Sequence, residues 1–253
     1  MRLLLEHSTK RCDRMKGYIH SFESLAAVDG DGLRCAVFLS GCPLRCIYCH
    51  NPDTWFKSEN ETDSESLVKK ISRYKTYFGK DGGVTFSGGE PLLQAEFINE
   101  TIPLLFEQKI GYIIDTSGIC DLTPTVCEVL KNSQSVLLDL KFWDNESYLK
   151  YTGMGIEKVI ETLSYLDSIG KKTIIRTVIV PGINDSDEIL DKYTDLVSGY
   201  SCISKYELLA FHTMGFFKYE KLGIENKLKD VSPLSHDTLF KLQTYINTKI
   251  DLK

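Results

Sequence analysis

The sequence contains no long hydrophobic run. The apolar stretch 1–5 is brief and is followed at once by charged residues. A helix that crosses a bilayer needs roughly 18 or more apolar residues in succession, and the core of a signal peptide is also longer than this stretch. We therefore expect neither a membrane anchor nor a secretion signal, and we interpret the chain as a cytoplasmic protein.

Positive charge is also scarce. The chain has 30 Lys and Arg residues against 35 Asp and Glu residues, which gives a net charge of −5. A dedicated nucleic-acid-binding protein usually carries a basic stripe, and the mildly basic stretch 10–16 is too short to form one. The composition therefore argues against a nucleic acid as the partner.

Linker segments are missing as well. No Pro-, Ser- or Gly-rich tract, low-complexity segment or internal repeat divides the 253 residues, of which 42% are apolar. A chain of this length can bury one sizeable core. We expect a single domain over residues 17–253, preceded by a loose N-terminal extension at 1–16.

Short apolar or β-branched runs alternate with amphipathic stretches along the chain. The expected strands are 34–40, 83–87, 111–115, 135–140, 173–180 and 205–211. The expected helices are 64–78, 94–109, 123–131, 156–169, 186–198 and 234–249. This alternation predicts right-handed crossovers and a parallel sheet. About six such units fit, fewer than the eight of a closed barrel, so the pattern favours an α/β fold with a partial barrel.

Three of the eight cysteines are clustered. Cys42, Cys46 and Cys49 form a C-x3-C-x2-C array directly after an apolar run. Three thiolates on a short loop can hold three irons of a [4Fe–4S] cluster, which takes four ligands when it only carries electrons, so one iron stays open. Without a secretion signal, we expect the thiols to be reduced. The scattered cysteines are interpreted as small buried hydrophobic residues, and they are Cys12, Cys35, Cys120, Cys127 and Cys202.

A zinc site is the alternative for the same loop. His50 follows Cys49 directly, and a Cys3His set is a common tetrahedral zinc site. Adjacent residues rarely both point at one ion without strain. The loop therefore favours iron–sulfur over zinc.

Polar and glycine residues gather where the predicted strands end, which is the edge where such sheets place their functional loops. The strand at 83–87 runs into Gly88-Gly-Glu90-Pro. Glycine at a strand end allows the backbone to approach a ligand closely, although a tight strand-to-helix turn uses the same residues. The other polar strand ends are Asp115-Thr116, Asp139-Leu-Lys141, Arg176 and His212.

Each of these strand ends has a structural alternative to ligand binding. Charges beside buried strands must be paired, liganded or solvated. Thr116 can cap a helix, and Asp139 can pair with Lys141 at the surface. Arg176 can belong to a structural ion pair, and a lone histidine such as His212 is often a packing residue.

Read together, the cysteine array, the Gly-Gly-Glu turn and the segment Tyr48–Trp55 resemble the glycyl-radical-enzyme activases of the radical S-adenosylmethionine (SAM) superfamily. The resemblance covers about residues 17–250. The interval from His50 to Lys80 contains no further cysteine array, which is similar to the single-cluster activases of pyruvate formate-lyase. The resemblance implies one domain with a partial (β/α)6 TIM-like barrel, and one [4Fe–4S] cluster bound by Cys42, Cys46 and Cys49.

The resemblance also implies which residues surround the cofactors. The expected SAM contacts are Tyr48, Cys49, His50, Gly88, Gly89, Glu90, Asp139, Leu140, Lys141, Arg176 and His212. A monovalent cation, Na⁺ or K⁺, is expected at oxygen atoms from Asp115, Thr116, Leu138 and Asp139. Asp29 is expected near the substrate glycine. Family members commonly have proline where this chain has Asp31.

The reaction implied by the resemblance begins with a one-electron donor, flavodoxin or ferredoxin. SAM is then cleaved to methionine and a 5′-deoxyadenosyl radical, and this radical takes a hydrogen atom from a backbone glycine of a partner enzyme, here expected to be pyruvate formate-lyase. Arg45 and Lys57 are expected to help dock an acidic flavodoxin, and the chain is expected to be a monomer.

Three alternatives remain open on sequence alone. The partner can be another glycyl-radical enzyme, such as the anaerobic ribonucleotide reductase. The chain can be a radical SAM enzyme that acts on a small molecule. More remotely, it can be a zinc-stabilised binding module without catalytic activity.

Overall fold

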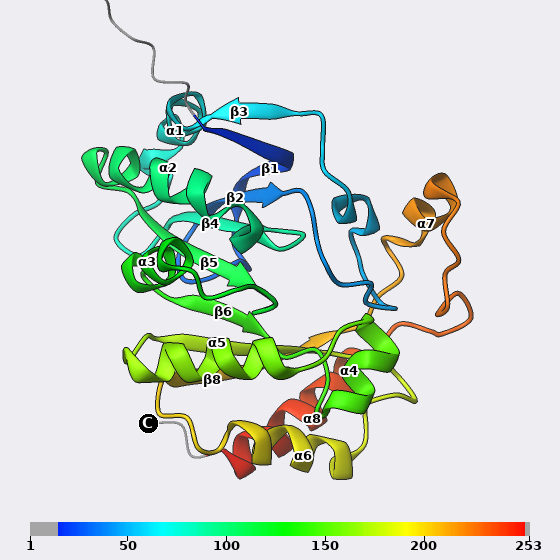
Figure 1. Ribbon diagram of the computed structural model, residues 1–253. Helices are drawn as coiled ribbons and strands as arrows, with labels where there is room; N and C mark the ends of the chain where they lie inside the picture. The colour runs from blue at the N-terminus through cyan, green and yellow to red at the C-terminus, as the bar shows by residue number, and fades with distance from the viewer. Residues whose placement is uncertain (1–14, 251–253) are drawn as a thin grey trace, which may run out of the picture.

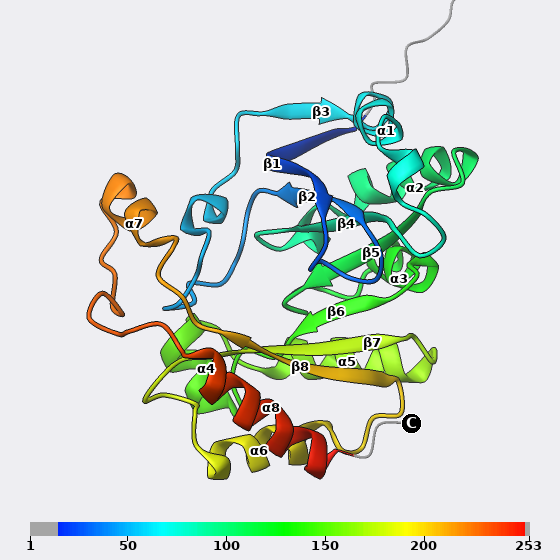
Figure 2. The same cartoon turned by 180° about the vertical axis from the view of Figure 1, so that it is seen from behind.

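One curved sheet of eight strands organises the computed structural model, which describes residues 15–250 (Figures 1 and 2). The strand order is β3-β1-β2-β4-β5-β6-β7-β8. The strands are β1 Lys16–Ala26, β2 Arg34–Leu39, β3 Glu61–Asp63, β4 Gly83–Gly88, β5 Gly111–Thr116, β6 Val136–Asp139, β7 Thr173–Ile179 and β8 Ile203–Ala210. From β2 to β8 the pairing is parallel, and β1 and β3 add antiparallel strands beside β2. Because β3 and β8 stand at opposite ends of this order, the expected partial α/β barrel is confirmed.

Helices cover the convex side of the sheet, except α7, which lies apart at the mouth of the barrel. The helices are α1 Ser64–Ser72, α2 Ala95–Glu107, α3 Pro124–Asn132, α4 Asn145–Thr152, α5 Glu157–Ser168, α6 Asp187–Val197, α7 Phe216–Leu222 and α8 His236–Lys249. Several begin where a side-chain oxygen accepts a backbone N–H of the first turn, as at Asp63, Thr123, Asp144, Ser186 and Ser235. Within residues 15–250, no helix has the length and apolarity needed to span a membrane.

Side chains alternate between the two faces of each strand, as strand geometry requires. On β5, Tyr112 and Ile114 belong to the large core beneath the helices, whereas Ile113 points to the other face. There it forms a small separate apolar cluster with Leu137 and Ile174. The next residues on this inner face, two positions further along β5, β6 and β7, are all charged. The inside of the barrel is therefore apolar at its base and charged at its carboxyl end.

All six predicted strands and all six predicted helices are present, and the described residues contain two further strands and two further α-helices that were not predicted. The strands β1 and β3 lie at the edge of the sheet, and β1 alternates half-buried with exposed residues, so its apolar signal is weak. The helix α4 has a weak amphipathic pattern, and α7 buries only Tyr219. The predicted helix at 64–78 ends earlier, at Ser72.

The expected N-terminal extension lies almost wholly outside the described residues. Residues 1–14 are not described, and β1 already begins at Lys16. Lys16 pairs with Asp63 of the antiparallel strand β3, so the last residue of the expected extension belongs to the sheet.

Candidate active site

A cavity of about 260 Å³ opens at the carboxyl ends of the parallel strands. The predicted site residues that line it are Asp29, Cys42, Cys46, Tyr48, Cys49, His50, Gly88, Gly89, Asp115, Thr116, Asp139, Lys141 and Arg176. Those that stand outside its wall are Glu90, Leu138, Leu140 and His212. Ser87 and Ser117 also line the cavity, although neither was predicted as a site residue. The structure thus brings most of the predicted residues together.

The cysteine loop is closed on itself by backbone hydrogen bonds. Gly41 N donates to the carbonyl oxygen of Thr54 (2.8 Å), and Cys42 N donates to that of Trp55 (3.3 Å). Midway round the loop, Arg45 N donates to the carbonyl oxygen of Thr152, the last residue of α4 (2.7 Å). These bonds fix the loop at its base and at its tip, so that all three thiols face the cavity.

Burial holds the three thiols in their protonated form. It raises the pKa of Cys42 to about 12, and it also raises the pKa of Cys46 and of Cys49. A bound metal must therefore displace three thiol protons. Within residues 15–250, no three His, Cys, Asp or Glu side chains converge closely enough to hold a single metal ion.

His50 and His212 form a pair at the rim of the cavity. Their rings meet edge to face, with centroids 4.4 Å apart. Burial lowers the pKa of His50, and the neighbouring His212 lowers it further. The Nδ1 atom of His212 is buried and has no hydrogen-bond partner among the described residues. The neutral form of His50 is therefore favoured.

The glycine turn after β4 packs backbone against backbone on the start of the cysteine loop. Gly88 has a φ of +118°, and a Cβ atom on it would lie 2.1 Å from the carbonyl oxygen of Leu39. A Cβ atom on Gly89 would lie 2.2 Å from the carbonyl oxygen of Gly41. Both positions therefore require glycine, and both leave bare backbone at the cavity.

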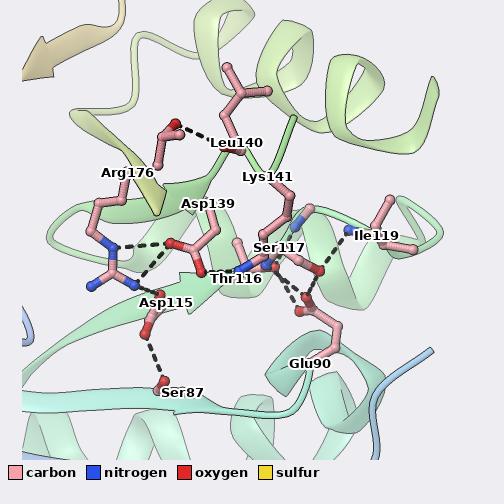
Figure 3. Close-up of polar contacts among 12 residues, drawn as sticks. Ser87, Glu90, Asp115, Thr116, Ser117, Ile119, Asp139, Leu140, Lys141 and Arg176 are labelled. Atoms are coloured by element: carbon pink, nitrogen blue, oxygen red, sulfur yellow. Dashed lines mark hydrogen bonds and ion pairs between the residues drawn. The ribbon is translucent and has the colours of Figure 1, made fainter. Parts of the chain in front are cut away.

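Glu90 is fully buried behind this turn and is occupied by protein donors. Its Oε2 accepts the amide and the hydroxyl of Ser117, at 2.9 and 2.6 Å. Its Oε1 accepts the hydroxyl of Thr116 (2.7 Å) and the amide of Leu92 (3.1 Å) (Figure 3). Burial raises the pKa of Glu90, and these hydrogen bonds oppose that rise. The carboxylate therefore ties the loop after β4 to the loop after β5.

A row of paired charges forms one wall of the cavity (Figure 3). Ser87 Oγ donates to Asp115 Oδ2 (2.6 Å), and Arg176 Nη2 donates to Asp115 Oδ1 (2.5 Å). Arg176 Nε also donates to Asp139 Oδ1 (3.1 Å), and Lys141 Nζ donates to Asp139 Oδ2 (2.6 Å). Two carboxylates face two side-chain cations, so the row is charge-balanced.

The surroundings shift the pKa values of the two carboxyl groups of this row in opposite directions. Burial raises the pKa of Asp115, although Arg176 opposes this. For Asp139 burial also acts upward, but the charges of Lys141 and Arg176 outweigh it and leave the pKa lowered. Both side-chain cations have raised pKa values because these carboxylates outweigh their burial. The charged forms of Asp139, Lys141 and Arg176 are therefore favoured, whereas burial works against the charged form of Asp115.

The residues expected around a monovalent cation make other contacts here. Arg176 occupies both carboxylates, and the Thr116 hydroxyl donates to Glu90. Leu138 has its side chain in the core beneath the helices. Leu140 is also buried in that core, and its amide donates to the Arg176 carbonyl oxygen (2.9 Å). The cation site stays a prediction.

Two tyrosines hold the backbone of Lys141, one at its N–H and one at its carbonyl oxygen. Lys141 N donates to the Tyr148 hydroxyl (2.9 Å), and the Tyr193 hydroxyl donates to the Lys141 carbonyl oxygen (3.1 Å). The tyrosines come from α4 and α6, and both are fully buried. Sequence reasoning missed them because neither lies at a strand end.

Asp29 reaches the cavity from the turn between β1 and β2. Its carbonyl oxygen accepts the Thr85 hydroxyl (2.6 Å), and burial raises the pKa of its carboxyl group. The fully buried Arg34 donates to Thr85 Oγ1 (2.9 Å) and to the Asp31 carbonyl oxygen (2.8 Å). The Asp31 carboxylate pairs with Lys172 (2.8 Å). These contacts hold the turn without a proline at position 31.

The two expected docking residues lie beside aromatic rings. The Arg45 guanidinium stands 5.0 Å from the centroid of the Trp55 ring and donates to the carbonyl oxygen of Cys42 (2.8 Å). Lys57 Nζ lies 3.5 Å from the centroid of Tyr18. Both basic side chains are exposed next to the cysteine loop.

Comparisons with known proteins show which proteins this chain is similar to. The model of the radical SAM superfamily matches residues 37–193. The pyruvate formate-lyase-activating enzyme of Clostridium pasteurianum is 43% identical over 93% of this chain and 99% of its own length. That of Staphylococcus epidermidis is 38% identical over 92% of this chain and 96% of its own length.

Solved structures with similar folds are more distant in sequence. SuiB of Streptococcus suis, bound to its precursor peptide SuiA, has a TM-score of 0.66 at 20% identity. This match covers 84% of our chain and 44% of SuiB, so the chain spans less than half of that protein. A domain of a pyruvate-formate lyase-activating enzyme from Bacteroides vulgatus has a TM-score of 0.54 at 20% identity, over 66% of this chain and 94% of that domain. These matches concern the fold alone.

The family match spans more than half of the chain and includes the cysteine loop, the glycine turn, the charged row and Arg176. The curated relatives extend the similarity over nearly all of it. The chain therefore belongs to the radical SAM superfamily, and within it to the family of pyruvate formate-lyase-activating enzymes.

Proposed function

We propose that this protein cleaves SAM reductively and removes a hydrogen atom from a backbone glycine of pyruvate formate-lyase. The observation that carries the proposal is a single cavity shared by three thiols, a bare glycine turn and a charge-balanced row. The names of the curated relatives, which are similar over their full length, support the choice of partner.

Membership of the superfamily implies a [4Fe–4S] cluster and SAM. Cys42, Cys46 and Cys49 fit the cluster because they offer three soft sulfur ligands to one cavity without converging on one ion. When bound, the reduced cluster supplies the electron that splits SAM into methionine and the 5′-deoxyadenosyl radical that takes the glycine hydrogen. The protein binds, orients and excludes water around this chemistry.

The charged methionine part of SAM fits the polar side of the cavity. Gly88 and Gly89 present backbone to its amino group, and Arg176 and Lys141 present positive charge to its carboxylate. Glu90 supports this contact by holding the glycine turn, since its oxygens already accept four hydrogen bonds.

The nucleoside part of SAM is assigned to the opposite rim. Tyr48, Cys49 and His50 lie there on the cysteine loop, with the ring of His212 packed against His50. Leu140 contributes by fixing the strand end that carries Lys141.

A monovalent cation at Asp115 and Asp139 is coupled to the binding of SAM. The two carboxylates are occupied by Arg176 here, so a Na⁺ or K⁺ ion can take their oxygens only when Arg176 turns toward the SAM carboxylate. The Thr116 hydroxyl and the Leu138 carbonyl oxygen are the further oxygen ligands in this proposal.

The open side of the barrel provides access for a polypeptide loop. On β8, at the open end of the sheet, Lys205 and Leu209 are exposed and Glu207 is half-buried. Asp29 lies inside the same cavity, where the substrate glycine must reach. We also propose that the protein acts as a monomer in the cytoplasm.

The electron donor is assigned to the basic surface beside the cysteine loop. The exposed Arg45 and Lys57 offer positive charge to an acidic flavodoxin or ferredoxin. Replacing both by Gln should slow reduction by flavodoxin and leave reduction by dithionite unchanged. An unchanged rate with flavodoxin would refute this docking site.

The proposed function is tested by anaerobic reconstitution with iron and sulfide, followed by SAM, a reductant and pyruvate formate-lyase. We expect a glycyl radical in the electron paramagnetic resonance (EPR) spectrum. Cys46→Ala should abolish SAM cleavage, whereas Cys127→Ser, which changes a half-buried thiol outside the cavity, should retain it.

The other outcomes identify the alternatives. SAM cleavage without a radical on pyruvate formate-lyase would point to another glycyl-radical enzyme, such as the anaerobic ribonucleotide reductase, or to a small-molecule substrate. Zinc without cluster absorption would overturn the assignment of the three cysteines.

A further inference from the structure

The helix α7 at the mouth of the barrel has almost no core of its own. It buries only Tyr219, and among the helices and strands it packs mainly on the short 3-10 helix Pro52–Trp55, which follows the cysteine loop (Figure 1). A helix of this length is marginal by itself in water and needs tertiary contacts to stay folded. The cysteine loop is therefore the main support of α7.

Three residues on one side of this helix face the cysteine loop. Gly215, directly before α7, packs its backbone on His50, since a Cβ atom there would lie 2.3 Å from the His50 carbonyl oxygen. Lys218 and Tyr219 follow three and four positions later, which places them on the same side of the helix. The Tyr219 hydroxyl donates to the Cys49 carbonyl oxygen (2.8 Å). This side of α7 thus contacts two successive residues of the loop.

Lys218 makes the charged part of this contact. Its Nζ donates to Asn51 Oδ1 (2.7 Å) and pairs with Asp53 Oδ2 (3.0 Å). The Asp53 carboxylate also contacts Nε2 of His20 on β1, at 3.1 Å. The side chains of Lys218 and Asp53 are 19% and 29% exposed, so water screens the pair only in part. Lys218 thus ties the segment after Cys49 to α7, and Asp53 ties the same segment to β1.

The two ties come from opposite ends of the open sheet. The strand β1 lies near one end of the strand order, and α7 follows β8 at the other end. Contacts with the segment Asn51–Asp53 therefore span the open side of the barrel at its mouth. Cys49, His50 and Asn51 line the cavity there. Held from both ends of the sheet, the segment presents these residues to the cavity in one orientation.

We propose that Lys218 is a positioning residue for SAM: it holds Asn51 and Asp53 against α7 and thereby places the rim Cys49–Asn51 that receives the nucleoside part. The inference rests on the proposed function, which assigns the nucleoside part to this rim. Lys218 does not line the cavity, so it acts through the residues that it holds. Its ammonium makes charge-assisted hydrogen bonds, which are stronger than those between neutral groups. A rim fixed in advance leaves less freedom for SAM to remove on binding.

The test removes this charge and compares a second lysine of the same helix. Lys218→Met keeps an unbranched side chain without the ammonium. Lys221→Met is the matched control, because Lys221 is exposed and its Nζ lies 5.0 Å from the centroid of the Phe217 ring. SAM affinity is measured by equilibrium dialysis of reconstituted protein without reductant, beside iron and sulfide content. We expect Lys218→Met to bind SAM about tenfold more weakly at normal cluster content, since charge-assisted hydrogen bonds are lost.

The control variants separate positioning from a general structural role. Lys221→Met should keep the SAM affinity of the parent protein. Lys218→Arg keeps the charge and should recover most of the affinity that Lys218→Met loses. Unchanged SAM affinity in Lys218→Met would overturn the proposal. Loss of both cluster and SAM affinity, with no recovery in Lys218→Arg, would show a structural role alone and would overturn it too.

A second measurement needs neither cluster nor SAM. The ring of Trp55, at the end of the same segment, meets the Tyr219 ring at 90° with centroids 6.2 Å apart. Trp55 and Trp143 are the two tryptophans of the chain, so the Trp143→Phe protein reports on Trp55 alone. In this background, acrylamide should quench the fluorescence of Trp55 more strongly in Lys218→Met than in Lys221→Met. Equal quenching would contradict the tie between α7 and the cysteine loop.

Failure of the proposed function looks different. SAM binding without a glycyl radical on pyruvate formate-lyase would overturn the choice of partner and leave the difference in SAM affinity between the lysine variants in place. Zinc instead of a cluster would overturn the proposed function, while the quenching of Trp55 in the apoprotein would not change.

Discussion

Gly89→Ala is expected to destabilise the protein by about 3 kcal/mol and to impair cluster uptake. The new Cβ atom would lie 2.2 Å from the Gly41 carbonyl oxygen, whereas contacts under 3.0 Å essentially do not occur, so the two backbones must part by nearly 1 Å. Two hydrogen bonds join them, from Gly89 N to Leu39 O (2.9 Å) and from Glu90 N to Gly41 O (2.8 Å).

The magnitude follows from these contacts. Losing both hydrogen bonds costs about 2 kcal/mol at roughly 1 kcal/mol each. Overpacking adds roughly 1–3 kcal/mol, and the lower entropy of the unfolded chain returns roughly 0.4–1 kcal/mol. Gly182→Ala is the control, because Gly182 has a φ of +74° and no heavy atom within 4 Å of the new Cβ. It should cost about 1 kcal/mol or less, from the left-handed backbone alone.

Urea unfolding of the apoproteins, followed by circular dichroism, measures both values. Iron and sulfide content after reconstitution then shows whether the cysteine loop still forms. We expect reduced cluster content in Gly89→Ala and normal content in Gly182→Ala. Equal stability of the two variants would refute the argument that the glycine turn supports the loop by direct backbone packing.

Three further predictions concern the surroundings of the cavity. Arg176→Lys keeps the charge but cannot donate to two carboxylates at once, so SAM should bind about tenfold more weakly in equilibrium dialysis. Unchanged affinity would contradict the proposed contact of Arg176 with the SAM carboxylate. Tyr148→Phe leaves the Lys141 amide without its acceptor, so the free energy of unfolding in urea should fall by roughly 1–3 kcal/mol. An unchanged free energy of unfolding would contradict the role of Tyr148 in holding Lys141. The hydrogen bond from Lys172 lowers the pKa of Asp31, so Asp31 stabilises the folded state above its unfolded pKa of about 3.9, and this contribution is lost as the pH falls through the lower folded value. Asp31→Asn should therefore cost at most about 1 kcal/mol at pH 6 and nothing at the acid end of a urea series, since the pair is exposed; a difference that persists in acid would contradict this sign.

The sequence was sufficient for the parallel part of the sheet and for most of the cavity wall. Strand and helix periods are local, and parallel strands end at one edge, so Asp115, Asp139 and Arg176 could be placed together without coordinates. Their pairing could not be predicted, because the distance that decides whether Arg176 meets a carboxylate or a ligand depends on side chains from three strands.

The residues that sequence reasoning missed act over long separations. Tyr193 is 52 positions from Lys141, and Tyr219 is 170 positions from Cys49. Neither carries a motif of its own, and α7 is too short for a clear amphipathic pattern. Glu90 was predicted as part of the Gly-Gly-Glu motif, but its oxygens accept four hydrogen bonds, three of them from Thr116 and Ser117 on the loop after β5.

The charge balance of the row makes the proposed cation site and the proposed Arg176 contact to SAM depend on each other. If Arg176 turns to the SAM carboxylate, Asp115 and Asp139 keep only Lys141 between them, and a buried unpaired carboxylate is costly. A K⁺ ion restores the balance, so SAM should bind more tightly in potassium chloride than in choline chloride at equal ionic strength. Arg176→Gln removes the positive charge beside Asp115 and Asp139 even when SAM is absent. Potassium should therefore stabilise this variant against urea, unlike the parent protein. Potassium-independent SAM affinity together with a potassium-independent Arg176→Gln variant would show that side-chain cations alone neutralise the row.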